Sequence, residues 1–242
     1  MATSLPPDGH AGMTVTPDRT GSVYETLRDL IIQGRIAPGA RVIEAEVAAR
    51  LDVSRTPVRA ALQRLQQEGY VVANGTGLQL RLSVAPLTQE DASELFEIVG
   101  EVEGLAARRA ATLPADRRQR LVAEMNSLNG ALLAASRAAA PDPREIFDLD
   151  HRFHRAWVDA AAGPRLSAMH DAIKPQTDRY MRLYISALVD EIGTSVIEHD
   201  VTVRAIEAGQ PESAQVAVRT NWSHAAQRLA RVIQSLGERG AW

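Results

Sequence analysis

Residues 40–82 constrain the fold of this 242-residue chain more than any other segment. They predict a short helix over about 44–51, a tight turn, a second helix from Ser54 to about residue 68, and a hairpin. The hairpin tip, residues 74–77, is rich in glycine, and leucines alternate with polar residues over 78–82. Apolar residues at positions i, i+3, i+4 and i+7 give the second helix one buried face. They are Val58, Ala61, Leu62 and Leu65. This order of elements predicts a winged helix-turn-helix.

The polar face of the second helix carries the residues that we expect to read DNA. Ser54 stands at the N-cap, and Thr56 follows in the first turn. Arg55 and Arg59 lie near the N-terminus of the helix, which is the end that a major-groove helix presents to base edges. Arginine can bond guanine O6 and N7 with two donors. An arginine-bearing amphipathic helix is more commonly only a solvated surface, but the order of elements around this one favours DNA binding.

The distribution of charge agrees with a DNA-binding segment. The whole chain has a net charge of -3, but residues 19–82 hold nine arginines against six acidic residues, a net charge of +3. Residues 83–242 have a net charge of -4, and residues 1–18 have a net charge of -2. The basic charge therefore lies where phosphate neutralisation needs it. Because +3 is modest, we expect a homodimer that places two copies on a pseudo-palindromic operator.

Several classes of protein are disfavoured. The sequence has no run of 18 apolar residues and no secretory signal, which predicts a cytoplasmic protein without a membrane span. The absence of cysteine excludes disulfides and thiolate metal sites. We expect no enzyme, because the H-E-x-x-H, G-x-S-x-G and phosphate-loop motifs are absent.

The rest of the chain is helical in pattern, so we expect a mainly α fold in which an all-α antiparallel bundle follows the winged helix. Further helices are predicted over about 114–138, 143–161, 164–188, 190–208 and 211–237, after one that begins at Thr88. Pro175 is expected to bend or break its helix. We divide the chain into a disordered tail (1–18), a DNA-binding domain (19–83), a linker (84–87), and a domain for effector binding and dimerisation (88–238).

Asp150 and His154 are the most chemically suggestive pair in the helical part. Their i, i+4 spacing puts both side chains on one helix face, where they can bind a metal with ligands from other helices. The histidines downstream are His170, His199 and His224. Oxygen and nitrogen ligands suit Zn, Ni or Mn. The simpler alternative is an ion pair on a helix surface.

The segment VYETLRDLIIQGRIAPGARVIEAEVAARLDVSRTPVRAALQRLQQEGYV resembles the amino-terminal domain of GntR-family bacterial transcription regulators. The resemblance covers residues 23–82 without a gap. It implies DNA contacts at the positions that match the family's; these are Ser54, Arg55, Thr56, Arg59 and the wing glycine Gly77. Ala60 departs from the glutamate that is usual in the family, which loosens the expected orientation of Arg59.

Residues 88–237 resemble the all-helical FCD effector domain of the FadR-like branch. The resemblance implies a divalent metal at Asp150, His154 and His199, with Asn221 where that branch usually has a fourth ligand, histidine. The alternatives are weak metal binding, recruitment of His224, and a metal-free ligand pocket.

A second departure from the FadR-like branch is Val99, at the effector-binding position where many relatives have an arginine that meets a carboxylate effector. An acidic effector would then need Arg179, Arg182 or the metal.

The sequence thus predicts a dimeric DNA-binding regulator, a repressor or an activator, that senses a small metabolite, with a carboxylate as one candidate. The first alternative is an architectural DNA-binding protein whose bundle only dimerises. The second is a metal-dependent hydrolase.

Overall fold

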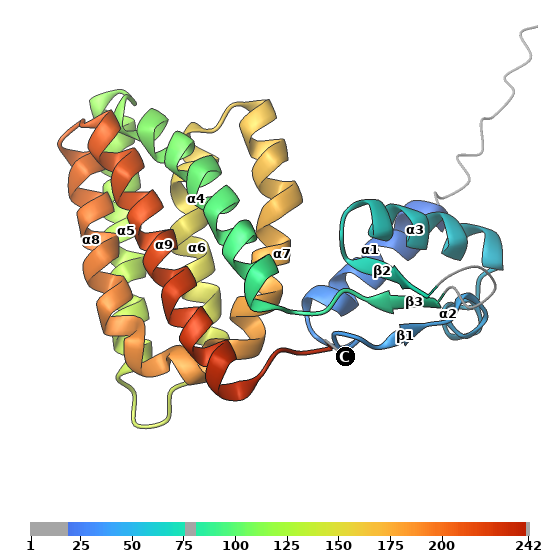
Figure 1. The fold of residues 1–242 in the computed structure, drawn as a ribbon. Coiled ribbons are helices and arrows are strands. Elements are labelled where there is room, and N and C mark those ends of the chain that lie inside the picture. Colours follow the sequence, from blue (N-terminus) through green and yellow to red (C-terminus); the bar gives the residue numbers. More distant parts are fainter. Residues whose placement is uncertain (1–18, 76–80, 241–242) are drawn as a thin grey trace, which may run out of the picture.

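The computed structural model describes residues 19–75 and 81–240 and has two parts, a small winged helix and a larger helical bundle (Figure 1). The predicted disordered tail and the wing glycine Gly77 lie outside the described residues. The winged helix contains α1 (Arg19–Ile32), β1 (Arg41–Val42), α2 (Glu44–Leu51), α3 (Arg55–Gln67), β2 (Val71–Asn74) and β3 (Arg81–Val84). Its mainly α architecture with a small sheet is the predicted one.

The apolar stripe of α3 forms the centre of the winged-helix core. The four residues predicted to be buried are between 0 and 1% exposed, and they pack with α1, α2 and the strands. The tight turn between α2 and α3 depends on Asp52, which adopts a left-handed conformation with φ of 52°. Val53 N–H then donates to the carbonyl of Ala48 and closes the end of α2. This turn aims α3 across α2 with its polar face outward.

The three described strands form an antiparallel sheet in the order β1-β3-β2. Val71 of β2 lies opposite Val84 of β3, and Asn74 lies opposite Arg81. Gly69, with φ of 80°, turns the chain from the end of α3 into β2. The hairpin of β2 and β3 therefore follows directly from the end of α3.

The bundle contains α4 (Gln89–Ala111), α5 (Ala115–Ser136), α6 (Pro143–Ala161), α7 (Pro164–Leu188), a 3-10 turn η2 (Val189–Glu191), α8 (Ile192–Glu207) and α9 (Pro211–Leu236). As the capping pattern predicted, the Thr88 side chain accepts a hydrogen bond from Asp91 N–H at the start of α4. Pro175 was expected to bend or break its helix; the break is wrong, because α7 continues through this residue. Its neighbours Lys174, Thr177 and Asp178 are buried, and this tertiary packing outweighs the lost backbone bond. None of the described helices has the length and hydrophobicity that a membrane span requires.

Helices α4 and α9 lie side by side through much of the bundle (Figure 1). Small residues permit the close approach. A Cβ added at Gly100 would lie 3.1 Å from Cβ of Trp222, and one added at Gly104 would lie 3.2 Å from the backbone oxygen of Gln215. On the opposite side of α4, Ile98 and Leu105 are 40% and 45% exposed. The buried face of α4 is the one that carries the glycines.

The C-terminal segment returns from α9 to the winged helix (Figure 1). Leu87 N–H donates to the carbonyl of Arg239, and Arg239 N–H donates to the carbonyl of Leu87. Gly240 then touches Gly39 so closely that a Cβ added to Gly39 would lie 2.6 Å from its Cα. The winged helix is therefore held to the bundle by the residues before α4 and by those after α9.

Candidate functional site

Asp150, His154 and His199 come together inside the bundle, as the metal hypothesis required. The first two lie on α6, and His199 lies on α8. One ligand atom from each lies within 4.8 Å of the others. Both histidines are almost fully buried, with 4% and 1% exposure, whereas Asp150 is half-buried. The i, i+4 spacing on α6 and the packing of α8 in the bundle therefore bring the three side chains together.

The protonation state of His199 follows from its neighbour Asn129 on α5. The Asn129 Nδ2 group donates to the Val196 carbonyl at 3.1 Å and to Asp200 at 2.7 Å, which identifies its other side-chain atom as the acceptor Oδ1. Oδ1 lies 3.0 Å from His199 Nδ1, which must therefore carry the hydrogen. Burial and the neighbouring charges of His154 and Arg228 lower the pKa of His199 well below its usual value. The ring is neutral, and its Nε2 presents a lone pair.

His199 Nε2 is one of the few buried polar side-chain atoms without a hydrogen-bond partner among the described residues. An Asp150 carboxylate oxygen lies 3.8 Å from this nitrogen, too far for a hydrogen bond. A buried nitrogen lone pair without a donor costs free energy unless something else binds it. A neutral imidazole nitrogen beside a carboxylate is the donor set that a borderline divalent cation prefers, so the residues fit a metal.

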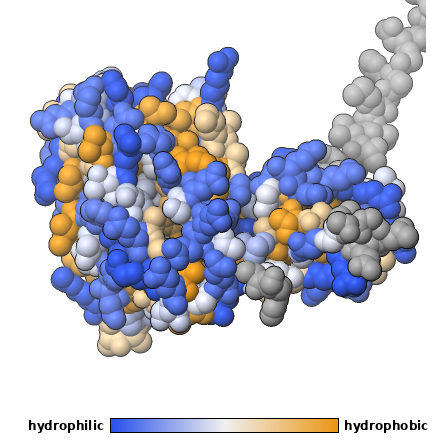
Figure 2. Space-filling view, in the orientation of Figure 1, coloured by the Kyte–Doolittle hydropathy of each residue, from blue (hydrophilic) through white to orange (hydrophobic). Residues whose placement is uncertain are grey.

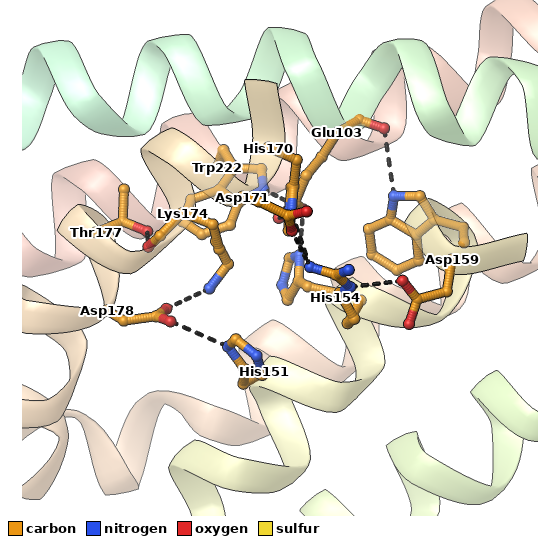
Figure 3. A network of polar contacts seen from close by, with 12 residues as sticks. Glu103, His151, His154, Asp159, His170, Asp171, Lys174, Thr177, Asp178 and Trp222 are labelled. Carbon is orange, nitrogen blue, oxygen red and sulfur yellow. Dashed lines mark hydrogen bonds and ion pairs between the residues drawn. The ribbon is translucent and has the colours of Figure 1, made fainter. Parts of the chain in front are cut away.

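His154 is oriented by Glu103, a fully buried carboxylate on α4 (Figure 3). His154 Nδ1 lies 2.8 Å from Glu103 Oε2, so the ring's Nε2 is left free on its other side. His170 and the indole N–H of Trp222 also contact this carboxylate, at 3.1 Å and 2.8 Å. Burial alone would raise the pKa of Glu103, but the charge of His154 and the hydrogen bonds from His154 and His170 lower it below its usual value. A carboxylate behind the histidine strengthens that histidine as a ligand.

Of the two candidates for a fourth ligand on α9, Asn221 lines the cavity beside the cluster, whereas His224 does not. Asn221 is 4% exposed, and its Nδ2 donates to Glu198 at 2.9 Å. Asn221 Oδ1 is therefore the side-chain atom that remains for another contact, and Asn221 lines the same cavity as Asp150. His224 instead pairs with Glu198 at 2.8 Å, and its side chain is 46% exposed. The structure brings Asn221, and not His224, to the cluster.

A cavity of about 30 Å³ adjoins the cluster and is lined by Asp150, His154, His199 and Asn221, together with Arg228 of α9. This volume is about that of one water molecule. The Arg228 guanidinium donates to both carboxylate oxygens of Glu198 at 3.0 Å, and it is 7% exposed. The site has room for an ion, and a larger ligand would have to displace side chains.

The residues considered for binding an acidic effector lie elsewhere. Val99 is fully buried in the core of the bundle. Arg179 and Arg182 of α7 line a different cavity, next to the winged helix. The structure therefore does not bring these three residues to Asp150. Arg228 is the arginine beside the cluster.

The described residues expected to contact DNA lie on α3 and at its N-cap. They are all exposed: Ser54, Arg55, Thr56 and Arg59. Ser54 occupies the N-cap position of α3 without forming a side-chain cap bond. Glu44 of α2 holds Arg59 through Nε at 3.2 Å and a second nitrogen at 3.0 Å. Glu44 thus orients Arg59 even though residue 60 is alanine. Gly77 cannot be placed, since it lies outside the described residues.

Comparison with known proteins agrees with this architecture. Residues 19–77 match the model of bacterial regulatory proteins of the gntR family, and residues 94–224 match the FCD domain. The chain belongs to the GntR family. It is 32% identical over 211 residues to an uncharacterized HTH-type transcriptional regulator in an unstable DNA locus of Streptomyces ambofaciens, covering 86% of this chain and 85% of the relative.

A second GntR-family relative is a probable D-xylose utilization operon transcriptional repressor of Paenarthrobacter nicotinovorans, 30% identical over 203 residues, with 81% of this chain and 84% of the relative covered. A putative GntR transcriptional regulator from Rhodococcus sp. RHA1 has a similar structure, with a TM-score of 0.64, 26% identity and coverage of 87% and 97%. The fold of E. coli McbR/YncC is also similar, with a TM-score of 0.65, 21% identity and coverage of 90% and 99%. This GntR-family chain is a DNA-binding transcription regulator with an FCD effector-binding domain, not an enzyme.

Motif reading of this GntR-family chain missed three residues of the site. Glu103, Asn129 and Arg228 lie on α4, α5 and α9, far in sequence from the residues that they contact. For Glu103 the sequence offered one usable signal: it is the one acidic residue on a helix face that otherwise carries small and apolar residues. A carboxylate in such a position indicates a buried polar contact. No spacing pattern linked Asn129 to His199.

Proposed function

We propose that the chain is a dimeric regulator whose affinity for a pseudo-palindromic operator changes when a small metabolite binds in the FCD domain. The observation that carries the sensing part is the cluster of Asp150, His154 and His199, with its buried, unpartnered Nε2 among the described residues. The relative named for D-xylose utilization supports a metabolite response in this family.

We propose Asp150, His154 and His199 as the protein ligands of a divalent metal, Zn, Ni or Mn, with Asn221 Oδ1 as a weaker fourth ligand. The bound cation would supply a positive charge for an anionic group of the effector. Glu103 and Asn129 orient the two histidines, and Arg228, which Glu198 holds through two hydrogen bonds, lines the cavity. An effector that contains a carboxylate would compete with Glu198 for Arg228.

On the DNA side, Arg55 and Arg59 of α3 are the proposed base-reading residues, with Ser54 and Thr56 contacting the backbone. All four are exposed on one side of the winged helix. The hairpin of β2 and β3 is the proposed wing, and Gly77, which lies outside the described residues, is a proposed DNA contact on the basis of the sequence alone. Glu44 limits the conformations of Arg59 and so reduces the entropy that the arginine loses on binding DNA.

For the dimer, the proposed contact is the outer face of α4 and α9. Ile98, Leu105 and Val216 are 40%, 45% and 57% exposed there. Val216 also lines a groove of about 530 Å³ between the two helices. Figure 2 presents this side of the bundle, on which apolar residues are interspersed among hydrophilic ones. Exposed apolar side chains gathered on one face are typical of an interface.

Metal analysis of the variants His199→Ala and His224→Ala tests the sensing site. Both remove one histidine, but only His199 belongs to the cluster, so His199→Ala is expected to lose the metal and His224→Ala to keep it. Equal metal content in the two variants would remove the basis for this site. Titrating metabolites into the operator complex then separates a regulator from an architectural protein, because an architectural protein shows no response.

The dimer is tested by sedimentation of Leu105→Glu, with Met169→Glu as the control. Met169 on α7 is 59% exposed but lies outside the proposed contact. A charge at Leu105 should give monomers, whereas the control should remain dimeric. A monomeric wild type, or a dimeric Leu105→Glu protein, would reject this contact.

A further inference from the structure

A second cavity, of about 330 Å³, lies at the junction of the winged helix and the bundle. Its described lining comes from the end of α1 and the turn that follows, from α7, and from the C-terminal segment. Three of the lining residues are arginines: Arg179, Arg182 and Arg239. None of the described lining residues is acidic. The cavity is therefore positively charged and bounded by both parts of the protein.

Arg179 is the residue that most requires a partner. It is 5% exposed, and its one hydrogen bond to a described residue runs from Nη2 to the carbonyl of Ala85, at 2.6 Å. No described carboxylate lies within 4.0 Å of it, and burial lowers its pKa. A guanidinium has five N–H donors. None of its nitrogens is both buried and unpartnered, so the remaining donors reach space that solvent can enter, and the cavity supplies that space.

The other two arginines contribute charge at the edges of the cavity. The backbone of Arg239 pairs with Leu87, which fixes this residue beside α7, and its exposed side chain approaches Tyr184. Arg182 stacks on Phe147, with Cζ 3.9 Å from the ring centre, and lies 3.8 Å from Asp148. Arg182 is thus partly neutralised, whereas Arg239 has no carboxylate within 4.0 Å among the described residues.

The C-terminus of α1 makes the cavity less positive, because a helix C-terminus carries roughly half a negative charge. Two arginines without carboxylate partners outweigh it. Arg179 donates to a carbonyl, and the carboxylate of Asp91 acts on it only from beyond 4.0 Å. A buried cation with such weak compensation is costly, and a bound anion reduces that cost. Arginine also binds the oxygens of phosphate and carboxylate groups with paired hydrogen bonds.

We infer that this cavity binds a small oxyanion with at least two negative charges, a phosphate ester or a dicarboxylate, between Arg179 and Arg239. The volume suits a small metabolite. This site is separate from the cluster at Asp150, and it does not depend on metal binding or on the proposed effector pocket. Because both parts of the protein line the cavity, a bound anion fixes their relative orientation.

Calorimetric titration of the full-length protein with inorganic pyrophosphate, and separately with succinate, tests this site at an ionic strength held constant with sodium chloride. Each lost charged hydrogen bond should weaken binding about tenfold or more in Arg179→Gln and Arg239→Gln. Arg239 is exposed, so Arg239→Gln should fold even if Arg179→Gln does not. Arg165→Gln, a change of an exposed arginine at the far end of α7, should bind like the wild type.

The two anions distinguish the chemical classes. Tighter binding of pyrophosphate identifies a phosphate ligand, and tighter binding of succinate identifies a dicarboxylate. The inference is overturned if the wild type binds neither anion, or if both arginine variants bind as the wild type does. It is also overturned if binding is lost in Asp150→Asn or in Arg55→Gln, because those results place the anion at the metal cluster or on the reading helix.

Discussion

Single residues control the cluster of Asp150, His154 and His199 through atoms that face away from it. Asn129 accepts a hydrogen bond from Nδ1 of His199, and Glu103 accepts one from Nδ1 of His154. Nε2 of each histidine thus remains to face another ligand; at His154 this nitrogen must lose a proton when a metal binds, because Glu103 outweighs the effect of burial and raises the pKa of the ring. The ligand set therefore depends on two residues that bind no ligand themselves.

Replacing Asn129 with leucine tests this dependence. Without the amide, neither nitrogen of His199 is preferred, so we expect affinity for the divalent metal to fall about 10- to 100-fold. Chelator competition measures the affinity, and circular dichroism checks the fold. Asn126→Leu is the matched control, because Asn126 is exposed on the same helix. If both variants bind metal equally, Asn129 has no role in orienting His199.

The same residues mark the limit of prediction from the sequence. Asp150 and His154 were found because they share one helix, and the spacing on a helix fixes which residues share a face. His199 and Asn221 were found by resemblance to a family. Glu103 and Asn129 were not found, since their contacts depend on how α4 and α5 pack against α6 and α8. Packing between distant helices has no local sequence pattern.

At the scale of elements, α3 was predictable because its apolar stripe, the turn before it and its polar face all indicate the same helix.

Arg55→Ala should lower affinity for the specific operator by about 1–3 kcal/mol and leave binding to random DNA almost unchanged. The reason is that a base contact carries sequence information, whereas a phosphate contact does not. Binding assays on both DNAs at one salt concentration measure the difference. Equal losses on both DNAs would show that Arg55 contacts only the backbone.

Helix α7 was less predictable, because tertiary packing of its buried residues outweighs the backbone bond that Pro175 removes. Lys174 and Asp178 form a buried pair with 2.5 Å between Nζ and Oδ1, and His151 approaches the same carboxylate (Figure 3). Lys174→Met leaves Asp178 buried without this cation and should lower the free energy of unfolding by about 3–5 kcal/mol. The double variant Lys174→Met/Asp178→Leu should regain most of that loss. Denaturant unfolding measures both, and a double variant no more stable than the single one contradicts the expectation.

The pair also predicts a dependence on pH. Burial alone would raise the pKa of Asp178, but Lys174 and His151 lower it below its usual value. The folded pKa is then lower than the unfolded value of about 3.9, so the pair's stabilisation is present above that value and is lost as the pH falls through the folded pKa. In Lys174→Met, the loss of folding stability on acidification should begin at a higher pH than in the wild type. Unfolding curves between neutral and acid pH compare the two proteins.

At the scale of the whole molecule, α9 connects the two functional ends. It carries Asn221 and Arg228 at the cluster, and the segment that follows it pairs with Leu87 and touches Gly39 of the winged helix. A ligand that moves α9 therefore acts on the orientation of the winged helix through a short connection. The sequence predicted a linker at 84–87, but it gave no sign of this second connection, since contacts between glycines far apart in the sequence leave no periodic pattern.

Gly240→Ala tests the second connection. A Cβ at Gly240 would lie 2.4 Å from the backbone of Pro38 and Gly39, so the segment must separate from the winged helix. We expect metal binding to be unchanged and the coupling between effector and operator, typically about 1–3 kcal/mol, to decrease. Operator affinity measured with and without effector gives the coupling. Gly237→Ala is the matched control, because it also has a positive φ, of 83°, but its added Cβ meets no described atom within 4 Å. If both variants lose coupling equally, backbone strain is responsible, and if neither does, the signal passes through residues 84–87 alone.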